Sequence, residues 1–362
     1  MKERAQSIFS KLVEPVDAIL LINAEEPLLD VAFYYATGLT SGLFEGCPAI
    51  LWPDGRTQII SSRLEETSAR TSYSDILIFA NKAERDQLLT ESLKGVRRLG
   101  FNGDGLTYAN LKVIERVAPG AQLLDVGKAI QAARMIKDAR EIEAIRQACR
   151  IASKVADEIP LMLHEGISET EMAAELGYRM QKLGATSISF ETISAFGPGS
   201  AEPHYTPGQR RLRPGEPALF DFGCKYDRYC SDITRTYFLE SIPKKFERIY
   251  QVVLEAQQKA LDTIRAGVKG SDVDAAARNH IDRSGYPDAL IHSVGHGLGL
   301  SVHDGGRMGP NDNLVLEENM VMTVEPGIYI PGKVGVRIED NIRVTRDGYE
   351  MLTSADKRPM AV

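Results

Sequence analysis

The stretch FDFGCKYDRYCSDITRTYF, from Phe220 to Phe238, predicts a β-hairpin that carries one acid on each strand. Asp221 and Asp232 are equally distant from the point between Tyr226 and Asp227, so a chain reversal there would place the two carboxylates directly opposite each other. Opposed residues of an antiparallel pair have Cβ atoms about 4.5–5.5 Å apart. Like charges at this distance are destabilising unless a positive charge lies between them.

A second stretch, VEPGIYIPGKVGVRIED, predicts the same arrangement with two glutamates. Gly332, in a turn-forming Pro-Gly-Lys run, is midway between Glu325 and Glu339, so these acids would also face each other. Asp221 and Glu325 are both flanked by apolar residues, which places them at the edge of a core, where an unpaired carboxylate is costly. Two divalent cations about 3.5–4 Å apart would balance the four acids.

Three of the six histidines, His292, His296 and His303, fall within the glycine-rich motif HSVGHGLGLSVHD. Its run GHGLG is not a dinucleotide loop, because it lacks the strand–turn–helix context and the acidic residue that follow in such loops. His204 lies in a Gly/Pro-rich loop just before the aspartate hairpin, and loops of this kind often line active sites. One imidazole with four carboxylates is an oxygen-rich ligand set that suits Mn²⁺ or Co²⁺, with Zn²⁺ as an alternative.

The composition describes a globular protein of more than one domain. The chain has 362 residues, of which 43% are hydrophobic and 26% charged, and a net charge of −7, which favours neither nucleic acid nor an acidic membrane surface as a partner. No apolar run is long enough to span a membrane, and the N-terminal residues have no apolar signal core. The spacing of the four cysteines fits neither a disulfide framework nor a zinc ribbon, so a cytoplasmic location is expected.

The order of predicted elements divides the chain into a domain at 1–130 and a second at 131–362. In the first, short strands alternate with helices, which is typical of a small α/β domain; the expected strands are Ala18–Ile22, Ala49–Trp52, Thr57–Ile60, Ile76–Phe79, Arg98–Phe101 and Gln122–Asp125, and the expected helices are Ala83–Leu93 and Tyr108–Val117. In the second, strands and helices are partly segregated, which predicts an α+β fold. Its helices are expected to begin with Asp138 and Glu141, with Ser168 and Glu171, at Pro243, and with Ser271 and Asp274.

The candidate ligands occur in a fixed order along the chain: Asp221, Asp232, His296, Glu325 and Glu339. This order, with the local contexts DFGCKYDRYCSDITRTY, GHGLGLSVHD and VEPGIYIPGKVGVRIEDN, resembles the pita-bread metallopeptidase family, which includes prolidase, aminopeptidase P and methionine aminopeptidase. The resemblance covers the chain from about Ile136 onward and implies a C-terminal pita-bread catalytic domain. The N-terminal part is similar to the creatinase-like α/β domain of prolidases and aminopeptidases P, which methionine aminopeptidases lack. No ligand is missing, which argues against the metal-free creatinase branch.

The resemblance implies two divalent metal ions per subunit, held by the five residues above. Asp221 would bind one ion, His296 and Glu325 mainly the other, and Asp232 and Glu339 would bridge the two. Bound to both ions, a water would have a lowered pKa and act as the nucleophile.

The resemblance also implies roles for the residues around the metals. Glu325 would move a proton from the water to the leaving nitrogen, and His204 and His303 would hold the substrate and stabilise the oxyanion. His292 would line the substrate pocket. Two further residues would support the metal carboxylates: Thr234 and Arg337.

The implied activity is hydrolysis of the Xaa-Pro peptide bond by a homodimer, as an Xaa-Pro dipeptidase (prolidase) acting on proline-containing dipeptides. Arg307 stands where prolidase-like members carry an arginine that binds the dipeptide carboxylate, although Gly305 and Gly306 replace the bulkier residues expected before it. Three alternatives stay open: an aminopeptidase P acting on longer peptides, a hydrolase of another C–N bond, and a peptide-binding module without activity. The sequence does not fix the native metal or the residue preferred before proline.

Overall fold

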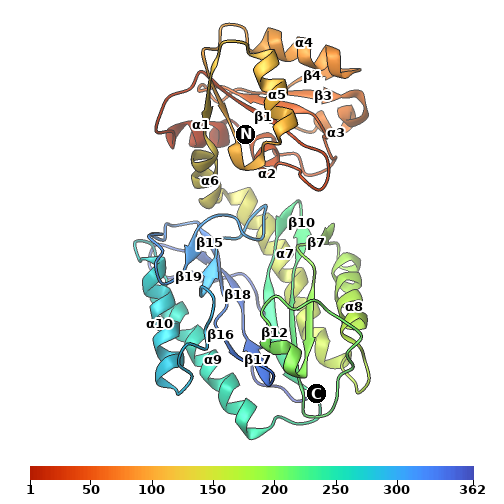
Figure 1. Ribbon diagram of the computed structural model, residues 1–362, viewed down its shortest axis with the longest axis vertical. Coiled ribbons are helices and arrows are strands. Elements are labelled where there is room, and N and C mark those ends of the chain that lie inside the picture. The colour runs from red at the N-terminus through yellow and green to blue at the C-terminus, as the bar shows by residue number, and fades with distance from the viewer. The chain divides into compact units, whose positions relative to one another are not determined.

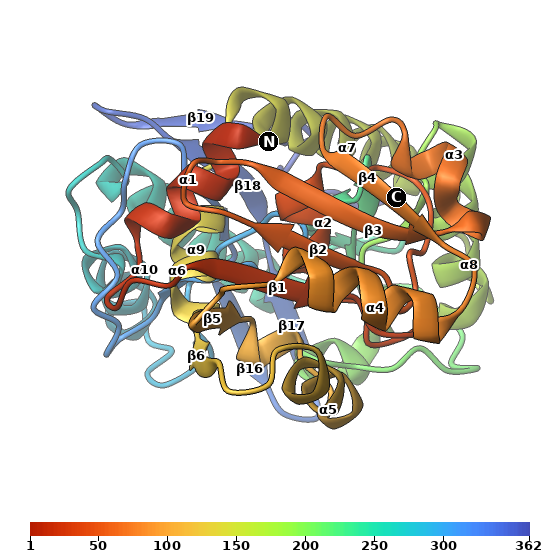
Figure 2. The same ribbon diagram turned by 90° about the horizontal axis from the view of Figure 1, so that it is seen from above.

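The computed structural model describes residues 1–362 and divides into two compact units, Met1–Arg134 and Met135–Val362. The first unit is built on one mixed sheet with the strand order β4-β3-β2-β1-β5-β6, which Figure 2 shows from one edge to the other. β1 and β3 each pair antiparallel with β2, whereas β1–β5, β3–β4 and β5–β6 are parallel. The strands are β1 (Ala18–Ile22), β2 (Pro48–Leu51), β3 (Thr57–Ser62), β4 (Asp75–Phe79), β5 (Arg98–Phe101) and β6 (Gln122–Asp125).

Helices accompany this sheet, as the alternating pattern predicted. All six predicted strands and both predicted helices are present, with ends that differ by at most two residues. The helices are α1 (Lys2–Ser10), α2 (Val31–Thr37), α3 (Glu66–Ala69), α4 (Lys82–Ser92), α5 (Tyr108–Val117) and α6 (Gly127–Met135), with 3₁₀ turns η1 (Arg63–Glu65) and η2 (Gly103–Gly105).

The second unit has strands between two pairs of helices, α7–α8 and α9–α10 (Figure 1). The helices are α7 (Ala139–Glu158), α8 (Glu169–Lys182), α9 (Lys244–Thr263) and α10 (Gly270–Arg283), with 3₁₀ turns η3 (Ile159–Leu161) and η4 (Gly197–Ala201). Its strands, which pair antiparallel, are β7 (Ser187–Ile188), β8 (Ile193–Phe196), β9 (Pro217–Phe222), β10 (Cys224–Tyr226), β11 (Tyr229–Cys230), β12 (Ile233–Phe238), β13 (Gly295–His296), β14 (Arg307–Met308), β15 (Val321–Val324), β16 (Gly327–Ile330), β17 (Val334–Arg337), β18 (Asp340–Val344) and β19 (Tyr349–Met351).

Two of the predicted helix starts are capping boxes. The Asp138 carboxylate accepts hydrogen bonds from the first turn of α7 while Glu141 accepts from the Asp138 backbone N, and Ser168 and Glu171 do the same for α8. The predicted cap at Ser271 is wrong, because α10 begins one residue earlier and has no side-chain cap.

Asp274 is unavailable as a partner for that cap. Its carboxylate pairs with Arg278 at 2.8 Å and accepts a hydrogen bond from the Val294 backbone N at 3.1 Å. It therefore fixes the beginning of the histidine motif rather than the start of its own helix.

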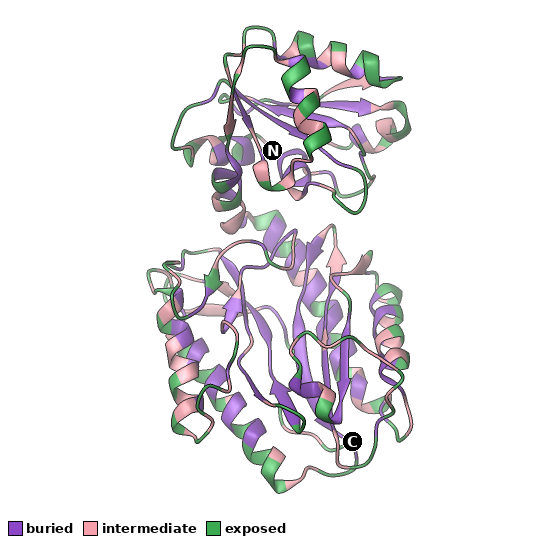
Figure 3. Ribbon diagram, viewed as in Figure 1, coloured by how far each residue is buried: buried purple, intermediate pink, exposed green.

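The core of the second unit lies between the strands and the inward faces of its helices. Figure 3 shows strands buried along most of their length and helices α8, α9 and α10 exposed on one face. One apolar cluster packs α9 and α10 against β15–β18, and another packs α7 and α8 against β9 and β12. The two acidic hairpins are therefore held between these clusters. No helix is long and apolar enough to cross a membrane.

Candidate metal centre

The aspartate hairpin carries both acids, but its register differs from the prediction. Asp221 pairs with Thr234, so the prediction that it lies directly opposite Asp232 is wrong. The chain reverses at Asp227 and Arg228, whose φ angles of 48° and 71° are those of a two-residue hairpin turn. Because strand side chains alternate between faces, the two-residue shift leaves both aspartates on one face as diagonal neighbours.

The glutamate hairpin has the predicted register. β15 pairs with β18 so that Val324 faces Asp340, and β16 pairs with β17 so that Gly327 faces Arg337. Glu325 and Glu339 occupy the opposed positions between these two ladders. The turn contains Gly332 with a φ of 69°, a conformation that glycine adopts without strain.

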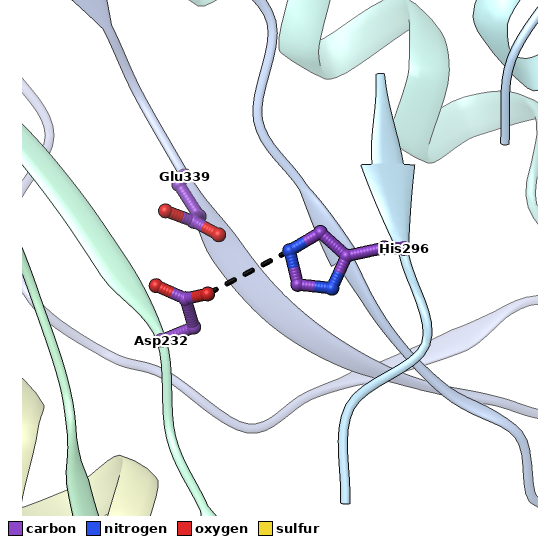
Figure 4. A group of neighbouring side chains, drawn as sticks. All are labelled: Asp232, His296 and Glu339. Atoms are coloured by element: carbon purple, nitrogen blue, oxygen red, sulfur yellow. Dashed lines mark ion pairs between the residues drawn. The ribbon is translucent and has the colours of Figure 1, made fainter. Parts of the chain in front are cut away.

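One histidine and the acids of both hairpins converge. One ligand atom from each of Asp232, His296 and Glu339 lies within 4.8 Å of the others, and Figure 4 shows the three side chains pointing toward one another. The Nε2 atom of His296 is 3.7 Å from Oδ2 of Asp232 and 3.4 Å from Oε1 of Glu325. These residues are far apart in the sequence and come from three different segments.

The carboxylates at this point have oxygen atoms without a protein partner. Oδ1 of Asp221, Oδ1 of Asp232 and Oε1 of Glu339 are buried and accept no hydrogen bond. Such atoms are rare in folded proteins and require an explanation. Divalent cations among them would supply it, and the oxygen-rich donor set with one imidazole fits such ions.

The pKa shifts show that the buried carboxylates destabilise one another's charged form. Burial raises the pKa of Asp232 well above its usual range, and the neighbouring Glu339 and Asp221 raise it further. Burial also raises the pKa of Glu339 well above normal, with Glu325 and Asp221 adding to it. For His296, burial lowers the pKa, which keeps the imidazole neutral and its lone pair free to bind a metal.

Arg337 and Thr234 hold the carboxylates in place. Arg337 is buried and donates from Nη2 to Oδ2 of Asp221 at 2.6 Å and from Nε to the Thr234 hydroxyl at 3.0 Å. The Thr234 hydroxyl in turn donates to Oε2 of Glu339 at 2.7 Å. The sequence placed both residues near the metal carboxylates, and the structure joins them in one chain of hydrogen bonds from Asp221 to Glu339.

The remaining predicted histidines surround the cluster at different depths. The His303 ring is 4.4 Å from the His296 ring in an edge-to-face arrangement. Partial desolvation lowers the pKa of His303, and the nearby His296 and His204 lower it further. His204 and His303 are exposed. His292 is half-buried, and its Nε2 is 2.8 Å from the Tyr329 hydroxyl.

Arg307 is not drawn into the cluster. Its backbone pairs with His296 across the β13–β14 bridge, but its side chain is exposed and forms an ion pair with Asp312 at 3.2 Å. The guanidinium is therefore exposed beside a neighbouring acid, and its role in binding a substrate carboxylate stays a prediction.

Three supporting residues were missed by the sequence reasoning. The Tyr329 hydroxyl accepts from Nη1 of Arg337 at 2.7 Å and so connects Arg337 to His292. The Thr323 hydroxyl accepts from the His296 backbone N and donates to Glu325. The Asn341 side chain accepts from the Asp232 backbone N. Tyr329 and Thr323 stand at even spacing from Glu325 on the same hairpin, which is the one signal that could have indicated them.

The comparisons with known proteins agree with this geometry. Residues 143–346 match metallopeptidase family M24, and residues 4–136 match the creatinase/prolidase N-terminal domain. The chain therefore belongs to metallopeptidase family M24 and is a peptidase. Metal ions are implied by this family, and the cluster around His296 is the site that fits them.

Individual relatives match the residues of both units. The X-Pro aminopeptidase from Thermotoga maritima MSB8 has a TM-score of 0.92 at 29% identity, over 99% of this chain and 100% of that one. The Xaa-Pro dipeptidase from Bacillus anthracis has a TM-score of 0.91 at 34% identity, over 100% of this chain and 99% of that one. The YkvY protein of Bacillus subtilis (strain 168) is 34% identical over 361 residues, 98% of each chain.

Proposed function

We propose that this protein is a dinuclear metal-dependent Xaa-Pro dipeptidase that hydrolyses the bond before proline in dipeptides. The convergence of Asp232, His296 and Glu339, with Glu325 3.4 Å from His296 and three buried carboxylate oxygen atoms left without partners, is the observation that carries the proposal. The similarity to an Xaa-Pro dipeptidase and to the prolidase from Pyrococcus furiosus, at 34% identity each, supports the substrate class.

Two divalent ions would be held by the two acidic hairpins and His296. Asp232 and Glu339 would bridge them. Asp221 would complete the ligands of one ion, and His296 and Glu325 would complete those of the other. Mn²⁺ or Co²⁺ is the proposed metal, because these ions accept mixed carboxylate and imidazole ligands. When bound, the ions would polarise the scissile carbonyl and lower the pKa of water at the site.

Residues of this chain would supply proton transfer and substrate orientation. Burial raises the pKa of Glu325 above its usual value, which suits a carboxyl group that must accept a proton and then release it to the leaving nitrogen. His303 and His204 stand exposed beside the cluster, where their ring nitrogens would hold the substrate and donate toward the developing oxyanion. The leaving nitrogen must gain a proton as the C–N bond breaks, and Glu325 would deliver it.

The direct test is to incubate the Mn²⁺- or Co²⁺-loaded protein with Xaa-Pro dipeptides and with matched Xaa-Ala dipeptides. Release of free proline, with little cleavage of the alanine substrates, would support the proposal. Equal cleavage of both would point to a broader C–N hydrolase, and cleavage of neither would reject the proposal. A chelator-treated sample serves as the control.

A second candidate is an Xaa-Pro aminopeptidase acting on longer peptides. Two observations favour it: the TM-score of 0.92 to the Thermotoga aminopeptidase, and the exposed side chain of Arg307, which pairs with Asp312 and not with any residue of the cluster. Xaa-Pro-Yaa tripeptides separate the two candidates, because a dipeptidase releases proline from Xaa-Pro only.

The remaining parts of the proposal concern assembly and location. The four cysteines are buried and free, which supports a reducing compartment such as the cytoplasm. A homodimer is proposed, and sedimentation of the metal-loaded protein would test it.

A further inference from the structure

A buried glutamate outside the carboxylate cluster holds the loop that carries His204 at points on both sides of that histidine. Glu169 is the first residue of α8 and is fully buried. Its Oε1 accepts a hydrogen bond from the Phe196 backbone N at 2.9 Å. Its Oε2 accepts from the Tyr205 hydroxyl at 3.0 Å and from the Gly208 backbone N at 2.9 Å. A single carboxylate therefore closes the loop from 196 to 208.

The charge of Glu169 is suited to this position. A buried carboxylate is costly unless it is well hydrogen-bonded, and three donors from one loop satisfy both of its oxygens. A negative side chain in the first turn of a helix is also stabilised by the helix dipole. The same segment is joined to the start of α8 by two backbone bonds, from Glu169 N to Arg210 O and from Thr170 N to Gly208 O.

A second anchor fixes the middle of the loop to the strand that carries Arg337. The buried hydroxyl of Ser200 accepts a hydrogen bond from the Gly335 backbone N at 2.8 Å and donates to the Gly197 carbonyl at 2.6 Å. A Cβ at Gly335 would lie 1.8 Å from the Ser200 carbonyl oxygen, so this approach requires glycine. The exposed His204 thus projects from a loop that is fixed on both sides of it.

We propose that Glu169 is a positioning residue that fixes the place of His204 before the substrate binds, an inference that rests on the proposed peptidase function. A group held in its productive geometry needs no ordering when the substrate arrives. The contacts of Glu169 reach the loop and no residue of the carboxylate cluster. Its loss should therefore act on catalysis through His204 and leave metal binding unchanged.

The test uses Glu169→Gln in the full-length, metal-loaded protein. The amide replaces one acceptor oxygen by an NH₂ donor, which then faces a backbone N–H of Phe196 or of Gly208. Glu175→Gln is the matched control, because Glu175 lies on the same helix, pairs with Arg179 and does not contact the loop. Tyr205→Phe removes one donor and keeps both backbone bonds, so it replaces Glu169→Gln if that variant does not fold.

Two kinetic results are expected. Glu169→Gln should lower kcat/KM for an Xaa-Pro substrate by about 10- to 100-fold, because a displacement of about 1 Å in a catalytic site can cost about 100-fold. Its metal content should equal that of the Glu175→Gln control. In a His204→Ala background, the same change should cost no more than about twofold, because the two residues act as one unit. An equal loss in both backgrounds, or a loss of metal, would overturn the proposal.

Hydrogen exchange tests the loop without any substrate. Amides of 197–208 should exchange at least about tenfold faster in Glu169→Gln, as expected when hydrogen bonds to a charged group are lost, while the C-terminal half of α8 stays protected. Unchanged exchange in the loop would refute the anchoring. Hydrogen exchange does not depend on the substrate class. It therefore still shows whether Glu169 anchors the loop if Xaa-Pro substrates are not cleaved.

Discussion

Thr234→Val removes one hydroxyl that joins two buried charged groups, and the structure gives the size of the effect. The hydroxyl donates to Oε2 of Glu339 at 2.7 Å and accepts from Nε of Arg337 at 3.0 Å. Valine has nearly the same shape, so packing is kept while both hydrogen bonds are lost. Oε1 of Glu339 already lacks a partner, so in the variant neither oxygen of that carboxylate would accept a hydrogen bond from the protein.

Each of the two buried charged groups left without its partner costs about 1–3 kcal/mol, so the free energy of unfolding should fall by about 2–6 kcal/mol. Loss of a residue that orients a metal ligand typically weakens metal binding or activity by about 10- to 100-fold. The assays are urea unfolding and Mn²⁺ titration by calorimetry. Thr234→Ser keeps the hydroxyl and is the control, expected within about twofold of the wild type in metal affinity. Equal Mn²⁺ affinity for the valine and serine variants would refute the reasoning.

Three further predictions concern the cluster and its surroundings. Asp232→Asn should lose bound metal and turnover together, because a neutral amide cannot replace a bridging carboxylate; full metal content by elemental analysis would show that Asp232 does not bridge. His303→Ala should lower kcat by about 100-fold or more with nearly unchanged metal content, and parallel loss of metal would instead place His303 among the ligands. The pKa values of Asp232 and Glu339 are raised by burial, so in the metal-free protein both oppose folding above the usual carboxyl pKa of about 4, and increasingly so until the pH passes their raised values. The rise in Tm caused by Mn²⁺ should therefore grow as the pH is raised above about 4, and a rise that shrinks with increasing pH would contradict the assignment.

The sequence was sufficient for the strands of the first unit and for the glutamate hairpin, because those depend on local signals. Gly332 marks the glutamate turn and fixes a register that holds from β15 to β18. The aspartate hairpin has no such signal. Its turn is made by Asp227 and Arg228 at positive φ, and arginine seldom adopts this conformation, so the turn was predicted one residue too early and the register was shifted by two.

The supporting contacts could not be predicted because they are long-range. Arg337 and Asp221 are 116 positions apart, and Tyr205 and Glu169 are 36 apart. No spacing rule connects such pairs before the fold is known. The misplaced cap at Ser271 has a similar cause, since the bond from the Val294 backbone N to the Asp274 carboxylate is a tertiary contact that outweighs a local preference.

The position of the metal ions in Mn²⁺-loaded crystals tests the central claim most directly, and anomalous diffraction would measure it. We expect two peaks about 3.5–4 Å apart, both bounded by Asp232 and Glu339, with His296 Nε2 bound to one of them. A single peak, or ions bound away from these three side chains, would contradict it.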